Sequence, residues 1–210
     1  MLAELKTVAA LSKLGAGTQD LRGGEYGQAL FGSLSPDYYE LVSRGLVFSG
    51  GTAATGVSHG TAIGTTGAFT LANPAGSAKN LVPLVCSMGY VSGTLGSGVV
   101  WYLANTNPAA AAVTGTAIAV TKNKLGGGPG NVGLAFTTAT LPVAPTILRP
   151  AWSVGPLLAT TAVPPYLVVD RLNGEYVITP GCSLTLHATC GAAGTSPLVV
   201  FGCAWAELDV

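Results

Sequence analysis

Charged side chains are scarce in this chain. Lys, Arg, Asp and Glu make up 9% of its 210 residues, against roughly a quarter in ordinary globular domains. Nine basic and nine acidic residues give a formal net charge of zero, so the whole chain has no electrostatic attraction to nucleic acid or to an anionic membrane. A surface built from Gly, Ala, Ser and Thr is more typical of a subunit covered by partners than of a lone soluble monomer.

Long apolar runs are also missing. No stretch reaches the ~18 uninterrupted apolar residues of a membrane span, and Glu4, Lys6 and Lys13 interrupt the apolar core that a signal peptide needs. We therefore expect the protein to fold in a cytoplasm. The four cysteines have no C-x-x-C spacing, and in a reducing compartment they are expected to be small buried hydrophobes rather than a disulfide or a metal site; they are Cys86, Cys182, Cys190 and Cys203.

Histidine is nearly absent, which limits catalysis and metal binding. The chain has only His59 and His187. His59 is expected in a surface loop, and a catalytic role would require an orienting acid. His187 is expected on the polar face of a strand spanning 182–190, facing solvent or an interface, because a metal needs three or four ligands. We predict no catalytic residue, no cofactor and no metal, and therefore no enzyme.

Two further patterns resemble chemical sites only superficially. The glycine-rich stretch 122–130 lacks the G-K-[ST] ending of a phosphate-binding loop, so we interpret it as a loop. After residue 50 the carboxylates are Asp170, Glu175, Glu207 and Asp209. Asp170 and Glu175 flank a predicted turn at 171–174 with Asn-Gly at its tip, and the turn explains them without a glycosidase pair.

Charge divides the chain into two parts, because residues 1–50 hold nine of the eighteen charged side chains. Within 1–44 the spacing of Leu2, Leu5 and Leu11 indicates one helix, and the segment 35–42, which contains Tyr38, Tyr39 and Leu41, predicts a second helix that Gly45 would end. We expect residues 1–44 to form an N-terminal helical arm and residues 45–210 a separate β domain.

The second part has short Val-, Thr- and aromatic-rich runs between Gly, Pro and Asn. The clearest is 182–190, in which apolar and polar residues alternate as in a strand with one buried face. Such spacing, without helical patterns between the strands, predicts a mainly β fold, an antiparallel jelly-roll-like β-sandwich. Strands are expected at 45–49, 62–72, 81–91, 98–104, 113–121, 146–154, 167–171, 175–179, 182–190 and 198–208.

Aromatic residues allow a different interpretation, a sugar-binding platform of the kind found in β-sandwich lectins. Most of them lie in apolar strand runs, where core or subunit contacts are favoured. A carbohydrate-binding module therefore stays an alternative. The residues concerned are Trp101, Tyr102, Trp152, Tyr166, Phe201 and Trp205.

Four segments together resemble small virion proteins of tailed bacteriophages that have an N-terminal helical arm and a β-sandwich. They are 80–102 (NLVPLVCSMGYVSGTLGSGVVWY), 138–150 (TATLPVAPTILRP), 180–187 (PGCSLTLH) and 199–207. The likeness covers most of residues 45–208 and rests on strand and turn patterns.

This resemblance implies a capsid decoration or cement protein, or a head-fibre base, in the virion after assembly in the host cytoplasm. It implies a homotrimer that contacts the major capsid protein and other virion proteins, with a head-to-tail or tail component as the alternative. No nucleic acid and no membrane is expected as a partner. The expected capsid-facing residues lie in the arm: Leu2, Leu5, Leu11, Tyr38, Tyr39 and Leu41.

Overall fold

The computed structural model divides the chain into two compact units, Met1–Tyr39 and Glu40–Val210. All of the described strands belong to the second unit. The predicted helical arm, with Leu2, Leu5 and Leu11, lies outside the described residues except at its end. The structure describes residues 37–94, 96–106, 112–128, 130–154, 167–190 and 197–210.

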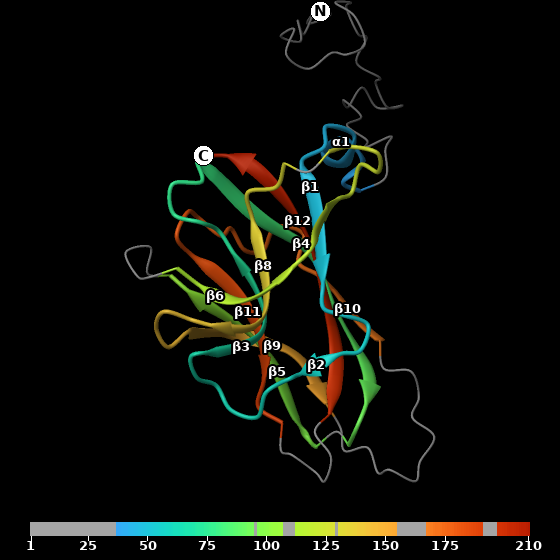
Figure 1. Cartoon of the computed structure of the whole chain (residues 1–210), viewed down its shortest axis with the longest axis vertical. Coiled ribbons are helices and arrows are strands. Elements are labelled where there is room, and N and C mark those ends of the chain that lie inside the picture. The colour runs from blue at the N-terminus through green and yellow to red at the C-terminus, as the bar shows by residue number, and fades with distance from the viewer. Residues whose placement is uncertain (1–36, 95, 107–111, 129, 155–166, 191–196) are drawn as a thin grey trace, which may run out of the picture. The chain divides into compact units, whose positions relative to one another are not determined.

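Two antiparallel sheets make up the second unit (Figure 1). In the first sheet the strand order is β10-β4-β12-β1-β7, and β2 pairs with the start of β12. Its strands are β1 (Val47–Gly51), β2 (Val57–Ser58), β4 (Lys79–Ser92), β7 (Val120–Lys122), β10 (Leu167–Arg171) and β12 (Leu198–Asp209).

In the second sheet the order is β6-β8-β3-β11-β5-β9. The prediction of a mainly β, antiparallel fold is confirmed, and the two sheets form a β-sandwich. The strands of this sheet are β3 (Thr66–Ala72), β5 (Gly98–Asn105), β6 (Thr114–Ile118), β8 (Leu134–Thr140), β9 (Thr146–Val154) and β11 (Ser183–Ala188).

The inner faces of both sheets share one hydrophobic core. Along β12, buried residues alternate with part-buried ones from Leu198 to Ala204, as expected for a strand whose one face is covered by a second sheet. Phe201 and Trp205 come from this strand, and Phe69, Tyr102 and Leu186 come from the opposite sheet; all are at most 2% exposed.

At one end of the core, a buried carboxylate fixes the loop before β8. Glu207 is 3% exposed, and its oxygens accept hydrogen bonds from the backbone N–H groups of Val132 and Gly133 at 2.8 Å and from the Trp205 indole at 3.1 Å. A carboxylate with this many donors is satisfied without a cation. Glu207 is therefore an anchor for the loop and not half of a catalytic pair.

The described helix is short. α1 spans Tyr39–Ser43, so the helix predicted over 35–42 begins later than expected, because Tyr38 has a left-handed φ of 64°. Gly45 terminates it, as predicted. The Gly45 N–H bonds the Val42 carbonyl, the Leu46 N–H bonds the Leu41 carbonyl, and Gly45 has a φ of 72°, which is the glycine-terminated Schellman motif. In the described part of the chain, no helix has the length and apolar character needed to cross a membrane.

Two strand predictions were wrong, and one strand was missed. Residues 113–121 are not one strand, because β6 and β7 belong to different sheets. Residues 175–179 form only an isolated bridge between Ile178 and Leu81. Finally, β8 was not predicted, because its Ala- and Thr-rich sequence alternates small residues and lacks the contrast of a half-buried strand.

The space around Glu207 yields a stability prediction. A Cβ added to Gly133 would lie 2.9 Å from Leu81 Cδ1 and from Trp205 Nε1, whereas one added to Gly128 would meet no atom within 4 Å. We expect Gly133→Ala to lower the free energy of unfolding by about 1–3 kcal/mol through overpacking and Gly128→Ala to leave it almost unchanged. Urea denaturation measures both, and equal values would contradict this packing.

Candidate functional site

His187 is a buried structural residue and not the solvent-facing histidine that the alternation predicted. All six residues of β11 are buried, so both faces of this strand are covered. The His187 Nδ1 accepts a hydrogen bond from the Ala68 N–H at 3.1 Å, and Nε2 lies 3.0 Å from the Ala62 carbonyl oxygen. This pattern assigns the proton to Nε2 and leaves neither nitrogen for a metal.

His59 is also buried, at 1% exposure, so its prediction as a surface residue was wrong. Its Nδ1 contacts the carbonyl oxygen of Gly60, and Nε2 has no hydrogen-bond partner. A Cβ on Gly60 would lie 2.2 Å from the His187 ring, so the backbone beside His59 packs directly on the second imidazole. Burial lowers the pKa of both histidines, which keeps them neutral near pH 7.

Cysteine chemistry is also suppressed. Cys86 and Cys203 face each other across β4 and β12 with their Sγ atoms 2.9 Å apart. The hydrogen bond from Cys86 and the burial of the site raise the pKa of the Cys203 thiol, which opposes formation of the nucleophilic thiolate. Cys190 is likewise buried. These three cysteines are small buried residues, as predicted, whereas Cys182 is only part-buried.

The two predicted turn acids form part of an ionic network at the edge of the sandwich. Arg149 on β9 holds Glu175 with two hydrogen bonds, of 2.9 and 2.8 Å, and Asp170 on β10 with one of 3.0 Å. Asp170 also accepts a hydrogen bond from the buried Tyr102 hydroxyl, whose ring lies under the guanidinium. The Arg149 guanidinium lowers the pKa of Glu175. Both acids are thus ion-paired, and the network links the edges of the two sheets.

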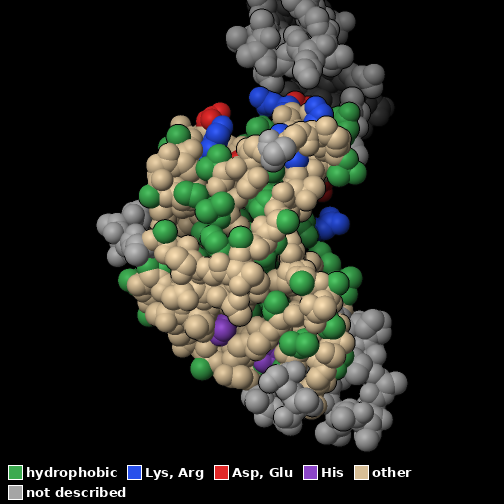
Figure 2. Space-filling model, in the orientation of Figure 1, with side chains coloured by type: hydrophobic (Ala, Val, Ile, Leu, Met, Phe, Trp, Pro, Cys, Tyr) green, Lys and Arg blue, Asp and Glu red, His purple; other side chains and the backbone are tan. Residues whose placement is uncertain are grey.

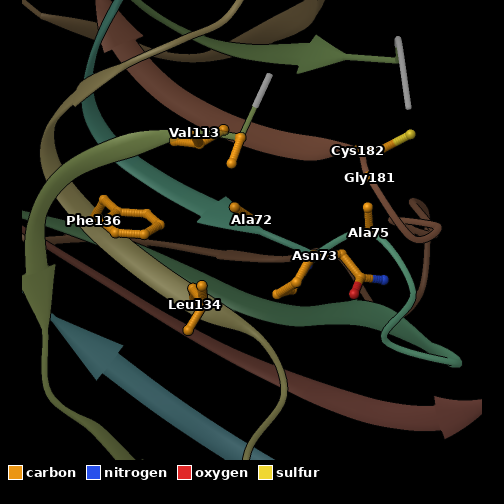
Figure 3. Close-up of a pocket in the computed structure, with 10 residues that line it drawn as sticks. Ala72, Asn73, Ala75, Val113, Leu134, Phe136, Gly181 and Cys182 are labelled. Atoms are coloured by element: carbon orange, nitrogen blue, oxygen red, sulfur yellow. The ribbon is translucent and has the colours of Figure 1, made fainter. Parts of the chain in front are cut away.

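One hollow opens on the outer side of the second sheet (Figure 3). It has a volume of about 310 Å³ and is lined mainly by apolar groups, among them Val113, Leu134 and Phe136. The one amide in its wall is committed, because Asn73 donates to the carbonyls of Lys79 and Ile178 and accepts from Ser77. The described lining therefore holds no acid–base pair.

A second hollow, of about 360 Å³, lies beside the Arg149 network. Leu148 and Val177 are part of its wall, and its only carboxylate among the described lining residues is Glu175, which Arg149 neutralises. Ser183 contributes a buried hydroxyl without a hydrogen-bond partner. In the described part of the chain, no three His, Cys, Asp or Glu side chains gather as metal ligands would.

The aromatic residues are placed mainly in the core. Tyr102, Trp205 and Phe201 are at most 2% exposed, and Trp152 is 9% exposed. Trp101 is half-buried, and its indole donates to the Thr189 hydroxyl at 2.8 Å. Tyr166 lies outside the described residues. The described members of this predicted set are therefore buried or half-buried.

Five exposed aliphatic side chains of the sandwich lie on or beside β9 and β10, which are edge strands of the two described sheets. We call this set the aliphatic edge. The network of Arg149 joins its two strands, and Leu148 and Val177 line the same hollow. Exposed apolar side chains gathered in this way are candidates for an interaction surface. The aliphatic edge consists of Ile147, Leu148, Leu167, Val169 and Val177, which are 39–69% exposed.

Charges are concentrated elsewhere. On the face shown in Figure 2, Lys, Arg, Asp and Glu side chains gather toward the end that carries α1 and the end of β12, and most of the remaining surface is uncharged. At that end Lys79 pairs with Asp209, and Lys124 donates to the Ser43 carbonyl. The rest of the visible surface therefore offers shape and apolar contact rather than ionic recognition.

No family model, curated protein or solved structure matches this chain. The site must therefore be interpreted from its geometry alone. Of the residues predicted to bind partners, Leu2, Leu5 and Leu11 lie outside the described residues, Tyr39 is 56% exposed, and Tyr38 and Leu41 are half-buried. The aliphatic edge was missed, and the exposed alternation of Leu167 and Val169 in β10 is the sequence signal that indicates it.

The buried histidines predict a dependence of stability on pH. Their pKa values are lowered below the ordinary 6.5 in the folded chain, so the unfolded chain binds protons first as pH falls. The free energy of unfolding should be level above pH 7 and fall below about pH 6.5, by at most about 1.4 kcal/mol per pH unit for each histidine.

Urea denaturation at about pH 7.5 and 5.5 measures this decrease. His187→Gln should make the decrease smaller. The depressed pKa of Glu175 affects stability only at lower pH, below the ordinary carboxyl value of 4.5, and so does not obscure the histidine effect. The double variant His59→Gln, His187→Gln should lose most of this decrease. If its stability fell as much as that of the wild type, the two histidines would not be the cause of the pH dependence.

The ionic network predicts that Arg149 contributes more to the free energy of unfolding than Lys79 does. Arg149→Met should lower the free energy of unfolding by about 1 kcal/mol, because it removes a bidentate pair and leaves the half-buried Asp170 without its cation. Lys79→Met is the control, because its partner Asp209 is 88% exposed and such pairs contribute little. Thermal or urea unfolding compares them, and an equal or larger effect at Lys79 would contradict a bridging role for Arg149.

Proposed function

We propose that this chain is a non-enzymatic structural subunit of a tailed-phage virion, a capsid decoration or cement protein built on a jelly-roll sandwich. In this proposal the β domain contacts other copies of itself, and the N-terminal arm contacts the major capsid protein. The aliphatic edge carries the proposal, because it is an exposed apolar surface on a domain whose described ionic groups are few and largely paired.

Strand order supports the jelly-roll topology. If β1, β3, β4, β5, β9, β10, β11 and β12 are numbered one to eight, the first pairs with the eighth, the second with the seventh, the third with the sixth and the fourth with the fifth. This is a long hairpin wrapped into two sheets, as in jelly rolls, which include viral capsid domains. The strands β6, β7 and β8 are then an insertion between the fourth and fifth strands.

The surface suits a cement function physically. A cement subunit stabilises a shell by many modest contacts made at once, so the contacts add through multivalency. Uncharged contact surfaces avoid the cost of stranding an unpaired charge in an interface. The Arg149 network fits this role, because it satisfies Asp170 and Glu175 internally and leaves the neighbouring aliphatic side chains as the exposed groups.

Deleting the arm tests the capsid contact. The chain without residues 1–44 is expected to keep the β domain folded, by circular dichroism and cooperative urea unfolding, and to lose co-sedimentation with heads assembled from the major capsid protein of the same genome. The full chain with Leu2, Leu5 and Leu11 replaced by Ser should lose it as well. Retained co-sedimentation in both variants would place the docking surface on the sandwich.

Oligomeric state tests the homotypic contact. The proposed trimer has a native mass near three times the 20.9 kDa of one chain, which light scattering coupled to size exclusion measures. The control is the same measurement over a wide range of protein concentration. A protein that stays monomeric at high concentration and binds no shell or ring component would overturn the virion assignment.

A further inference from the structure

We propose that β10 pairs with β10 of a second copy, antiparallel and centred on Val169, so that the first sheets of two subunits become one continuous sheet. This inference rests on the proposed function and names the strand and register of one homotypic contact. The contact is two-fold, so within a shell it joins neighbouring trimers rather than the copies inside one trimer.

An edge strand presents a row of unpaired backbone N–H and C=O groups, which is a template for another strand. Among the described strands, β10 is such an edge, because it pairs with β4 on one side and ends the first sheet on the other. Its register with β4 runs from Leu167 to Arg171 without a shift, and it contains no proline. Leu167 and Val169 are 69% and 52% exposed. A regular, apolar edge of this kind favours strand addition.

The other edges of the described sheets are protected. β9 contains Pro150, which lacks an N–H, and its register with β5 shifts twice. The register of β6 with β8 shifts between Thr114 and Thr116. β2 and β7 are only two and three residues long. Bulges, proline and short length are the devices that prevent edge pairing. The edge in another copy that best accepts β10 is therefore β10 itself.

Charge restricts the register. Asp170 lies on the half-buried side of β10, where it shares the Arg149 guanidinium with Glu175, so Arg171 is the charged residue on the exposed side of the strand. Centring the pair on Val169 places Arg171 opposite Leu167 and separates the two arginines by four residues along the strands, about 13 Å at ~3.3 Å per residue. This exceeds the Debye length of about 8 Å at physiological salt. Registers centred nearer Arg171 bring the like charges together.

In this register Val169 packs against Val169 of the second copy, the closest side-chain pair at the two-fold axis. Cross-strand pairs of β-branched side chains stabilise sheets, and like charges directly opposite each other destabilise them. A substitution at Val169 therefore reports on the contact without touching the core, because the side chain lies on the exposed face of β10.

Cysteine cross-linking of the full chain tests the register. V169C should form a disulfide-linked dimer under mild oxidation, seen on a non-reducing denaturing gel. V143C is the control, because Val143 is an exposed valine at 38% that lies outside both β10 and the aliphatic edge. The wild type measures the background from Cys182. Cross-linking of V169C no stronger than that of V143C would overturn the proposal.

Charge substitution tests the energetics. V169K should weaken concentration-dependent association in sedimentation velocity by about tenfold or more. V143K, at an exposed valine outside the aliphatic edge, should leave association unchanged, and mixing V169K with V169E should restore it. Unchanged association of V169K, or no rescue by mixing, overturns the β10 pairing. If the β10 pairing fails but the wild type still forms oligomers and binds heads, the proposed function survives. A wild type that neither oligomerises nor binds heads overturns both the proposed function and the β10 pairing.

Discussion

The packing of β12 against the opposite sheet is the interaction on which the rest of the structure depends. Its inward row, which includes Phe201 and Trp205, fills the space between the sheets. The same strand pairs with β1, β2 and β4, so its backbone organises the first sheet while its side chains hold the second. Glu207 on the same strand also holds the loop before β8, because it accepts a hydrogen bond from the Gly133 N–H, and Gly133 packs closely against Trp205.

Three buried polar groups inside the described sandwich are committed to hydrogen bonds within the fold. His187 joins Ala62 and Ala68, Glu207 holds two backbone N–H groups, and Thr70 bonds Thr185. A reactive site requires groups that are poised toward a substrate, and in these three contacts the hydrogen-bond partners are already in place. The side chains of the aliphatic edge are instead exposed.

The distribution of charge links stability to the proposed assembly. The Arg149 network joins the edges of the two sheets and pairs Asp170 and Glu175 with one guanidinium. The aliphatic side chains beside it are exposed. In the proposed assembly, specificity comes from shape and backbone pairing rather than from ion pairs. A regular strand edge provides backbone pairing, and the protected edges exclude competing arrangements.

The sequence by itself determined the class of fold and most of the strands, because residues such as Leu184, Leu186, Phe201 and Trp205 alternate along the chain and a strand has a period of two. It also determined the scarcity of charge and the end of helix α1 at Gly45. Only the tertiary structure decided that His59 and His187 are buried, that β6 and β7 lie in different sheets, and that Arg149 meets Asp170 and Glu175. The physical reason is that alternation reports the two faces of a strand, whereas burial of both faces and contacts between edges depend on segments distant in the sequence.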